Sequence, residues 1–177
     1  MNLNVTAGLL GILLCLAAFA ADKPKYGPKT TPLNQDHEYL QKHPAPDFWA
    51  LSSFYQAQRD ERSCTLATMA SMVNSFRAMK PMSADDKLAQ QGELLDRVNH
   101  EGWNRMFKQN GKTVTLDELT QIAVKALKLY GIDKKAEGLH VDSVDEKATA
   151  KIRDLLIQNE KSASDQVMVN VDRKSVV

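Results

Sequence analysis

The prolines of this chain are confined to its first half, and this limits where long helices can form. Five of the six lie between residues 24 and 46, and the last is Pro81. Proline fixes φ, lacks an N–H and restricts the residue before it, so residues 21–46 are expected to form a proline-rich extended arm. The compact domain is expected to cover residues 47–177, which is enough chain for one hydrophobic core.

Helical periodicity dominates that domain. Apolar residues recur at helical spacing in four stretches, namely residues 64–77, 83–99, 115–131 and 143–159. The third is bounded most clearly, because Thr115 and Glu118 form a capping-box pattern and Gly131 follows the last apolar residue. Ser83 and Ser143 are expected to cap the second and the fourth helix.

Two stretches show strand patterns instead. Residues 138–144 predict a short strand between the last two helices. Near the end of the chain, residues 165–172 place Val167, Val169 and Val171 on one side and Met168 on the other. Helices followed by strands indicate an α+β fold, with a helical half and the start of a sheet half.

The first twenty residues have the pattern of a signal peptide. Residues 7–20 form an uncharged apolar run, too short for a membrane span, and the run ends in an Ala-Phe-Ala sequence that a signal peptidase recognises. Because residues 1–6 carry neither Lys nor Arg, an uncleaved anchor stays open as the alternative. Cleavage would export the chain to the periplasm or beyond. It would also remove Cys15 and leave Cys64 as the one thiol.

Cys64 and Gln58 are the candidate site residues. Cys64 opens the first expected helix, where backbone N–H groups and the helix dipole favour a thiolate. The amide of Gln58, six residues earlier, can donate to an oxyanion on a carbonyl that the thiolate attacks. The alternative is a small buried cysteine beside an ordinary surface glutamine, and spacing alone slightly favours it.

A longer segment around Cys64 resembles the signature of the phytochelatin synthase family. The segment reads FYQAQRDERSCTLATMASMVNSF, and its matching positions are Phe54, Gln58, Cys64, Ala67, Val73 and Asn74. Further on, VTLDELTQIAVKALKLYG is similar to the family's T-L-x-E-L helix, and VMVNVDRKSVV to its strand and Arg-Lys turn. The resemblance runs from about Pro46 to the last residue. It departs at Thr65, where the family has Gly, and at Ala57, where it has Thr.

The resemblance implies a papain-like cysteine-protease fold and a glutathione gamma-glutamylcysteinyltransferase activity. Cys64 would be the nucleophile that cleaves the Cys-Gly bond of glutathione, with Gln58 in the oxyanion hole. The acyl group would pass to water or to a second glutathione. In the family, the histidine and aspartate of the triad follow the Arg-Lys turn, beyond Val177. A generic papain-like cysteine peptidase and an inactive truncated remnant are therefore the alternatives, and negligible turnover is expected of the 177-residue chain.

Cofactors and partners follow from the same reasoning. None of the four histidines, His37, His43, His100 and His140, lies in a matching motif or has metal-ligand spacing with Cys64. No dedicated metal site is expected, and activating metal ions would enter as metal-glutathione thiolates. With a net charge of +1, composition gives no reason to expect nucleic acid. The expected partner is glutathione, without a stable membrane anchor after signal cleavage; a homodimer is left open.

Overall fold

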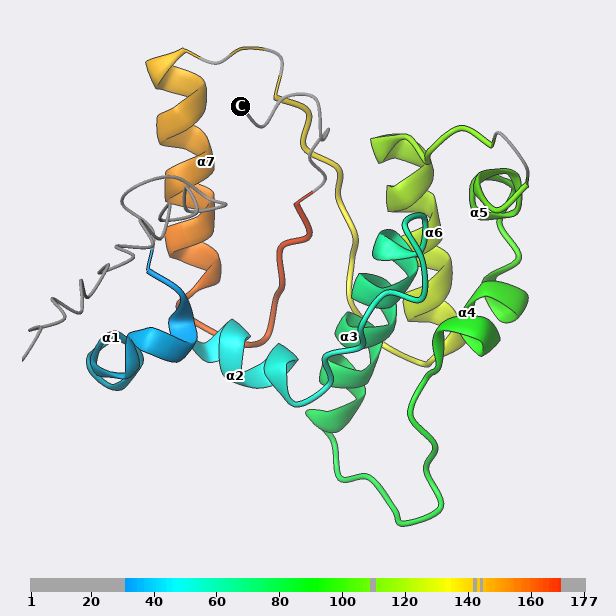
Figure 1. Cartoon of the computed structure of the whole chain (residues 1–177), viewed down its shortest axis with the longest axis horizontal. Helices are drawn as coiled ribbons and strands as arrows, with labels where there is room; N and C mark the ends of the chain where they lie inside the picture. The colour runs from blue at the N-terminus through cyan, green and yellow to red at the C-terminus, as the bar shows by residue number, and fades with distance from the viewer. Residues whose placement is uncertain (1–30, 109–110, 142, 144, 170–177) are drawn as a thin grey trace, which may run out of the picture. The chain divides into compact units, whose positions relative to one another are not determined.

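The computed structural model describes residues 31–108, 111–141, 143 and 145–169, so the expected signal peptide lies outside the described residues. The chain divides into two compact units, Met1–Gln41 and Lys42–Val177. The described residues form seven α-helices and one short 3-10 helix (Figure 1). Their bounds are η1 Leu33–Gln35, α1 His37–Lys42, α2 Pro46–Ser52, α3 Cys64–Ala78, α4 Gln91–Val98, α5 Glu101–Met106, α6 Leu116–Leu129 and α7 Glu146–Asn159.

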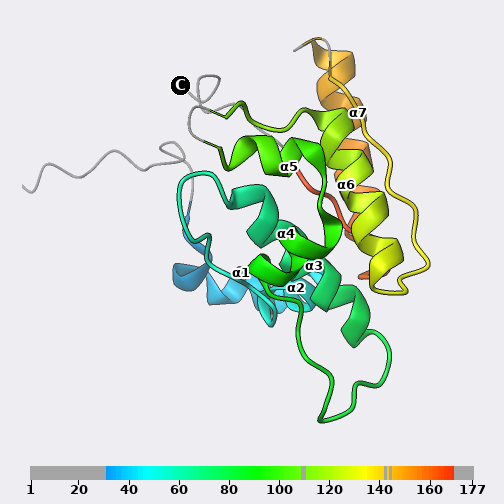
Figure 2. The same ribbon diagram turned by 90° about the vertical axis from the view of Figure 1, so that its right-hand side faces the viewer.

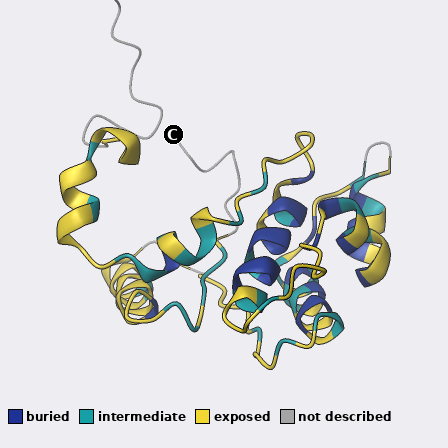
Figure 3. Cartoon of the chain, turned by 90° about the horizontal axis from the view of Figure 1, so that it is seen from below, coloured by how far each residue is buried: buried dark blue, intermediate teal, exposed yellow. Residues whose placement is uncertain are grey.

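The core of the second unit lies where α3, α4 and α6 pack against one another, and α2 packs against α3 (Figure 2). Its most deeply buried apolar side chains come from α3 to α6, and they are Leu66, Ala70, Val73, Leu94, Val98, Trp103, Ile122 and Ala126. Figure 3 shows the buried residues concentrated in these helices. The expected helix over residues 64–77 is confirmed, with its predicted apolar face inward except for the half-buried Phe76.

The helix α6 has both of its predicted ends. The Thr115 hydroxyl accepts from the Glu118 N–H at 3.2 Å, and the Glu118 carboxylate accepts from the Thr115 N–H at 2.9 Å. At the other end Gly131 has φ +64°, a left-handed conformation that glycine adopts without strain. The Ile132 N–H donates to the Leu127 carbonyl at 2.9 Å, which completes a Schellman motif.

The second expected helix starts later than predicted. The described structure begins α4 at Gln91, and Ser83 instead closes an isolated turn in which its N–H donates to the Asp86 carboxylate at 2.7 Å. The cause is the backbone of Ala89, whose N–H donates to Asn74 Oδ1 at 2.7 Å and whose carbonyl accepts from Asn74 Nδ2 at 3.0 Å. Since Asn74 occupies both groups, residues before Gln91 cannot form helical bonds through Ala89.

The start of the fourth expected helix is also corrected. Asp145, and not Ser143, caps α7, because its carboxylate accepts from the Ala148 N–H at 2.7 Å. The Ser143 hydroxyl donates to the other oxygen of Asp145 at 2.8 Å and so supports the cap from outside the helix. Aspartate binds a helix N-terminus through charge as well as through the hydrogen bond, which favours it over the serine.

The sheet half is not observed. The described residues contain no β-strand, so only the helical half of the expected α+β fold is present in them. Residues 142, 144 and 170–172, which complete the two expected strands, lie outside the described residues. Of the two sides of the valine alternation, it is the Met168 side that packs against the core, while Val169 is 67% exposed. A strand needs a paired neighbour, and neither segment has one in the described part.

Four of the described helical segments, η1, α1, α2 and α5, were not anticipated. The arm over residues 21–46 contains η1 and α1 in its described part, so it is not uniformly extended. Pro46 is the first residue of α2, a position where a missing N–H costs nothing and the fixed φ suits a helix. The short α5 begins after His100, whose ring nitrogen accepts from the Gly102 N–H at 3.1 Å. Proline restricts the residue before it and not the residues that follow. Pro46 therefore marks the start of α2 and not the absence of a helix.

We predict that Asn74→Ala lowers the free energy of unfolding by about 2–4 kcal/mol, because it leaves the buried N–H of Ala89 without a partner and its C=O with Gln56 alone. Chemical denaturation measures this. Thr68→Ala, on the exposed side of the same helix, is the control and should change stability by less than about 0.5 kcal/mol. Equal effects of the two substitutions would contradict the prediction.

Candidate functional site

Cys64 is an exposed free thiol and the first residue of α3. The turn before it is built by the buried Ser63, whose hydroxyl accepts from the Asp60 N–H at 2.9 Å and donates to the Asp60 carbonyl at 3.0 Å. The Arg62 N–H also donates to the Asp60 carboxylate at 2.8 Å. Because Ser63 uses its hydroxyl on Asp60 and not on α3, it does not cap the helix. Because the Cys64 side chain is exposed, the interpretation of Cys64 as a small buried side chain is wrong.

Two contacts to α5 and the residues after it hold the start of α3 in place. The indole Nε1 of the fully buried Trp103 donates to the Thr65 hydroxyl at 3.1 Å, and the Arg62 guanidinium donates to the Lys108 carbonyl at 2.8 Å. The Thr65 hydroxyl thereby satisfies a buried N–H that would otherwise be unpaired. The sequence contained no signal for this contact, since the residues are 38 positions apart.

Gln58 lies in the exposed loop between α2 and α3. The first part of this loop is tied down by Gln56, whose side chain donates to the Ala89 carbonyl at 2.8 Å, and by Gln91, which donates to the Ala57 carbonyl at 2.9 Å. No hydrogen bond joins Gln58 to Cys64 within the described residues. The glutamines that sequence reasoning missed, Gln56 and Gln91, are thus structural, and the oxyanion role of Gln58 stays a prediction.

Two of the described histidines, His100 and His140, have partners other than Cys64. His100 caps α5, and its Nε2 lies 3.3 Å from the Gln121 side-chain oxygen. Since its Nδ1 accepts from the Gly102 N–H, the ring proton is on Nε2. His140 Nε2 lies 3.1 Å from the Asp117 carboxylate, and both side chains are mostly exposed. Among the described residues, no histidine is hydrogen-bonded to the Cys64 sulfur.

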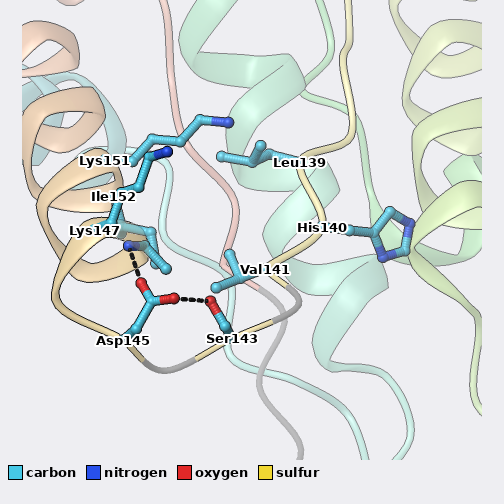
Figure 4. A pocket seen from close by; sticks show the side chains of 9 residues that line it. Leu139, His140, Val141, Ser143, Asp145, Lys147, Lys151 and Ile152 are labelled. Atoms are coloured by element: carbon cyan, nitrogen blue, oxygen red, sulfur yellow. Dashed lines mark hydrogen bonds between the residues drawn. The ribbon is translucent and has the colours of Figure 1, made fainter.

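A shallow hollow of about 210 Å³ lies elsewhere, between residues 139–143 and the first turns of α7 (Figure 4). Leu139, Val141 and Ile152 form its apolar lining, with Lys147 and Lys151 beside them. The His140 ring points away from this hollow in Figure 4, in keeping with its contact to Asp117. Neither Cys64 nor Gln58 lines the hollow, so it does not extend the candidate site.

The described part of the chain also has no group of three or more His, Cys, Asp or Glu residues arranged to hold a metal ion. Within the same residues, no helix combines the length and the apolar content that crossing a bilayer requires.

Comparison with known proteins identifies no relative: no family model, no curated protein and no solved structure matches this chain. The likeness to phytochelatin synthases therefore rests on the residues quoted for it.

We predict that iodoacetamide labels Cys64 in the folded protein at a rate within roughly one order of magnitude of that in denaturant, because exposure controls access to a thiol. A chain with Cys15→Ser ensures that the label reports on Cys64 alone. Protection of the folded protein by several orders of magnitude would contradict the exposed position of the thiol.

We further predict that Thr65→Val destabilises the protein by about 1–3 kcal/mol, since it removes the acceptor of the buried Trp103 N–H. In a Trp103→Phe background, which lacks that N–H, the same substitution should cost less than about 1 kcal/mol. Denaturation of the four proteins in this double-mutant cycle measures the coupling. Additive costs would show that the two side chains act independently.

Proposed function

We propose that this chain supplies the cysteine and oxyanion half of a papain-like enzyme that cleaves the Cys-Gly bond of glutathione. The observation that carries the proposal is the exposed thiol of Cys64 as the first residue of a 15-residue helix, on a turn whose serine leaves the helix uncapped. Helix starts of this kind favour negative charge, both on a thiolate and on an oxyanion formed beside it.

The chemistry of the proposal is acyl transfer. The Cys64 thiolate adds to the carbonyl carbon of the Cys-Gly bond, and the carbonyl oxygen becomes an oxyanion facing the first N–H groups of α3 and the Gln58 amide. When the tetrahedral intermediate collapses, the C–N bond breaks, the glycine amine takes up a proton, and a γ-glutamylcysteinyl thioester remains on Cys64. Water or the amine of a second glutathione then displaces the thiol.

The proposal extends to the rest of the molecule. The helical domain is consistent with the helical half of a papain-like fold, and the sheet half would provide the histidine that moves the proton. An exported location, glutathione as the partner and metal-glutathione thiolates as activators belong to the same proposal. The hydrogen bond from Trp103 to Thr65 holds the start of α3, and this supports a nucleophile held in one position.

One observation favours a second candidate function. Because no described histidine is hydrogen-bonded to Cys64, the helical domain by itself has a nucleophile without a paired base. Such a domain can bind a thiol without turning over a peptide bond. Its exposed thiolate can also attack the disulfide of oxidised glutathione, forming a mixed disulfide and releasing one glutathione thiol. A generic cysteine peptidase would show the same cysteine and differ in its substrate.

The test follows glycine release from glutathione and, by mass spectrometry, the γ-glutamylcysteinyl adduct on the chain. We expect a single, slowly formed acyl adduct on Cys64 that is absent in Cys64→Ser, with no more than one glycine released per chain. Gln58→Ala should slow its formation about 100-fold or more, because one oxyanion donor is lost. Glu61→Ala, in the same exposed loop, is the matched control and should leave the rate unchanged.

Three other results decide between the alternatives. With oxidised glutathione added, a glutathione mixed disulfide on Cys64 and no acyl adduct would support the thiol-binding function. An acyl adduct formed from unrelated peptides but not from glutathione would support a generic peptidase. Glycine release that persists in Cys64→Ser would refute the mechanism.

A further inference from the structure

A buried carboxyl oxygen without a hydrogen-bond partner lies in α2, outside the candidate site at Cys64. Asp47, in the first turn of α2, is 6% exposed, and it is the buried residue of that helix. Its Oδ1 atom is buried and has no hydrogen-bond partner among the described residues. Burial without a compensating hydrogen bond disfavours the charged form of a carboxyl group, so the group is stabilised by holding a proton.

The charged groups that act on Asp47 come from two other parts of the fold, and both are acidic. Glu160 ends α7, and Asp165 belongs to the segment that follows it. Figure 1 shows the C-terminal end of α7 beside the start of α2. Burial, Glu160 and Asp165 together raise the pKa of Asp47 to about 6, and burial is the largest cause.

The segment with these acidic residues is also where α7 attaches to the helical domain. Asn159 is the buried residue of α7, whereas Leu155, Leu156 and Ile157 are 38–53% exposed. Next to Asp165, the Gln166 amide donates to the buried Ser75 hydroxyl of α3 at 2.7 Å. Residues 159–166 thus connect α7 to the helical domain through polar groups. We call these residues, together with Asp47 of α2, the polar joint.

We propose that this joint is a proton-dependent latch, closed while the Asp47 carboxyl is protonated and loosened when it ionises. A protonated carboxyl can donate its O–H to a neighbouring carboxylate. An ionised Asp47 would instead be a buried charge with no donor on Oδ1, repelled by the exposed carboxylates of Glu160 and Asp165. Loosening would free α7 and the segment after it from the helical domain. This inference concerns α7 and is independent of the function proposed for Cys64.

The direction and size of the effect follow from linkage. The carboxyl has its ordinary pKa of 3.8 when the joint is open and a pKa of about 6 when it is closed. The closed form is therefore favoured fully below pH 4, and this advantage is lost as the pH rises through 6. A difference of about two pKa units changes the ratio of open to closed molecules by on the order of 100-fold.

The test is amide hydrogen exchange of α7 in the full chain between pH 4 and pH 8, corrected for the intrinsic exchange rate. We expect protection over residues 146–160 to fall between about pH 4 and pH 6, by up to about 100-fold, and to stay level at higher pH. Asp47→Asn cannot ionise and should abolish this dependence. Asp154→Asn, on the exposed face of α7, should leave it unchanged. Identical pH profiles for the parent protein and Asp47→Asn would overturn the proposal.

Two further measurements keep the test decisive if Asp47→Asn does not fold. Glu160→Gln and Asp165→Asn each remove one like charge, so each should move the midpoint to lower pH, and an unmoved midpoint in both would overturn the latch. Adding Ca²⁺ at pH 7.5 should leave exchange unchanged. If Ca²⁺ restored protection, the joint would be a cation site and not a proton-dependent one.

Discussion

The side chain of Asn74 holds the backbone of Ala89 through two hydrogen bonds, and much of the helical domain depends on this contact. Asn74 is fully buried in the middle of α3, the helix against which α2, α4 and α6 all pack. Gln56 adds a third bond to the same residue, from the loop that leads to α3. A buried amide that satisfies both groups of a distant residue cannot shift without exposing unpaired donors and acceptors. It therefore sets where the 79–90 loop ends and α4 begins.

The start of α3 is organised by contacts of a similar kind. Ser63 closes the turn on Asp60, and Trp103 reaches Thr65 from α5. The result is an exposed cysteine on a backbone that is held from both sides. Packing fixes α3, and the exposed start of this helix presents the nucleophilic thiol of Cys64. Asp47 differs in that its buried Oδ1 has no donor among the described residues, which disfavours its charged form.

Local patterns predicted those elements whose ends are made by their own residues. The ends of α6 were predictable because Thr115, Glu118 and Gly131 act on atoms within four residues of themselves. The inward face of α3 was predictable because helical periodicity places its apolar residues on one side. The cap of α7 was missed by two residues because a serine and an aspartate both fit the pattern, and the choice between them depends on charge at the helix end.

The sequence by itself determined the helical character of the domain, the bounds of α6, the buried face of α3 and the place of Cys64 at a helix start. Each of these depends on neighbours along the chain. Only the tertiary structure decided that Cys64 is exposed, that Thr65 pairs with Trp103, that α4 starts at Gln91, and that Asp47 is buried beside acidic residues. The last three depend on residues that are 15 or more positions apart, and an interaction across that separation leaves no periodic trace in the sequence.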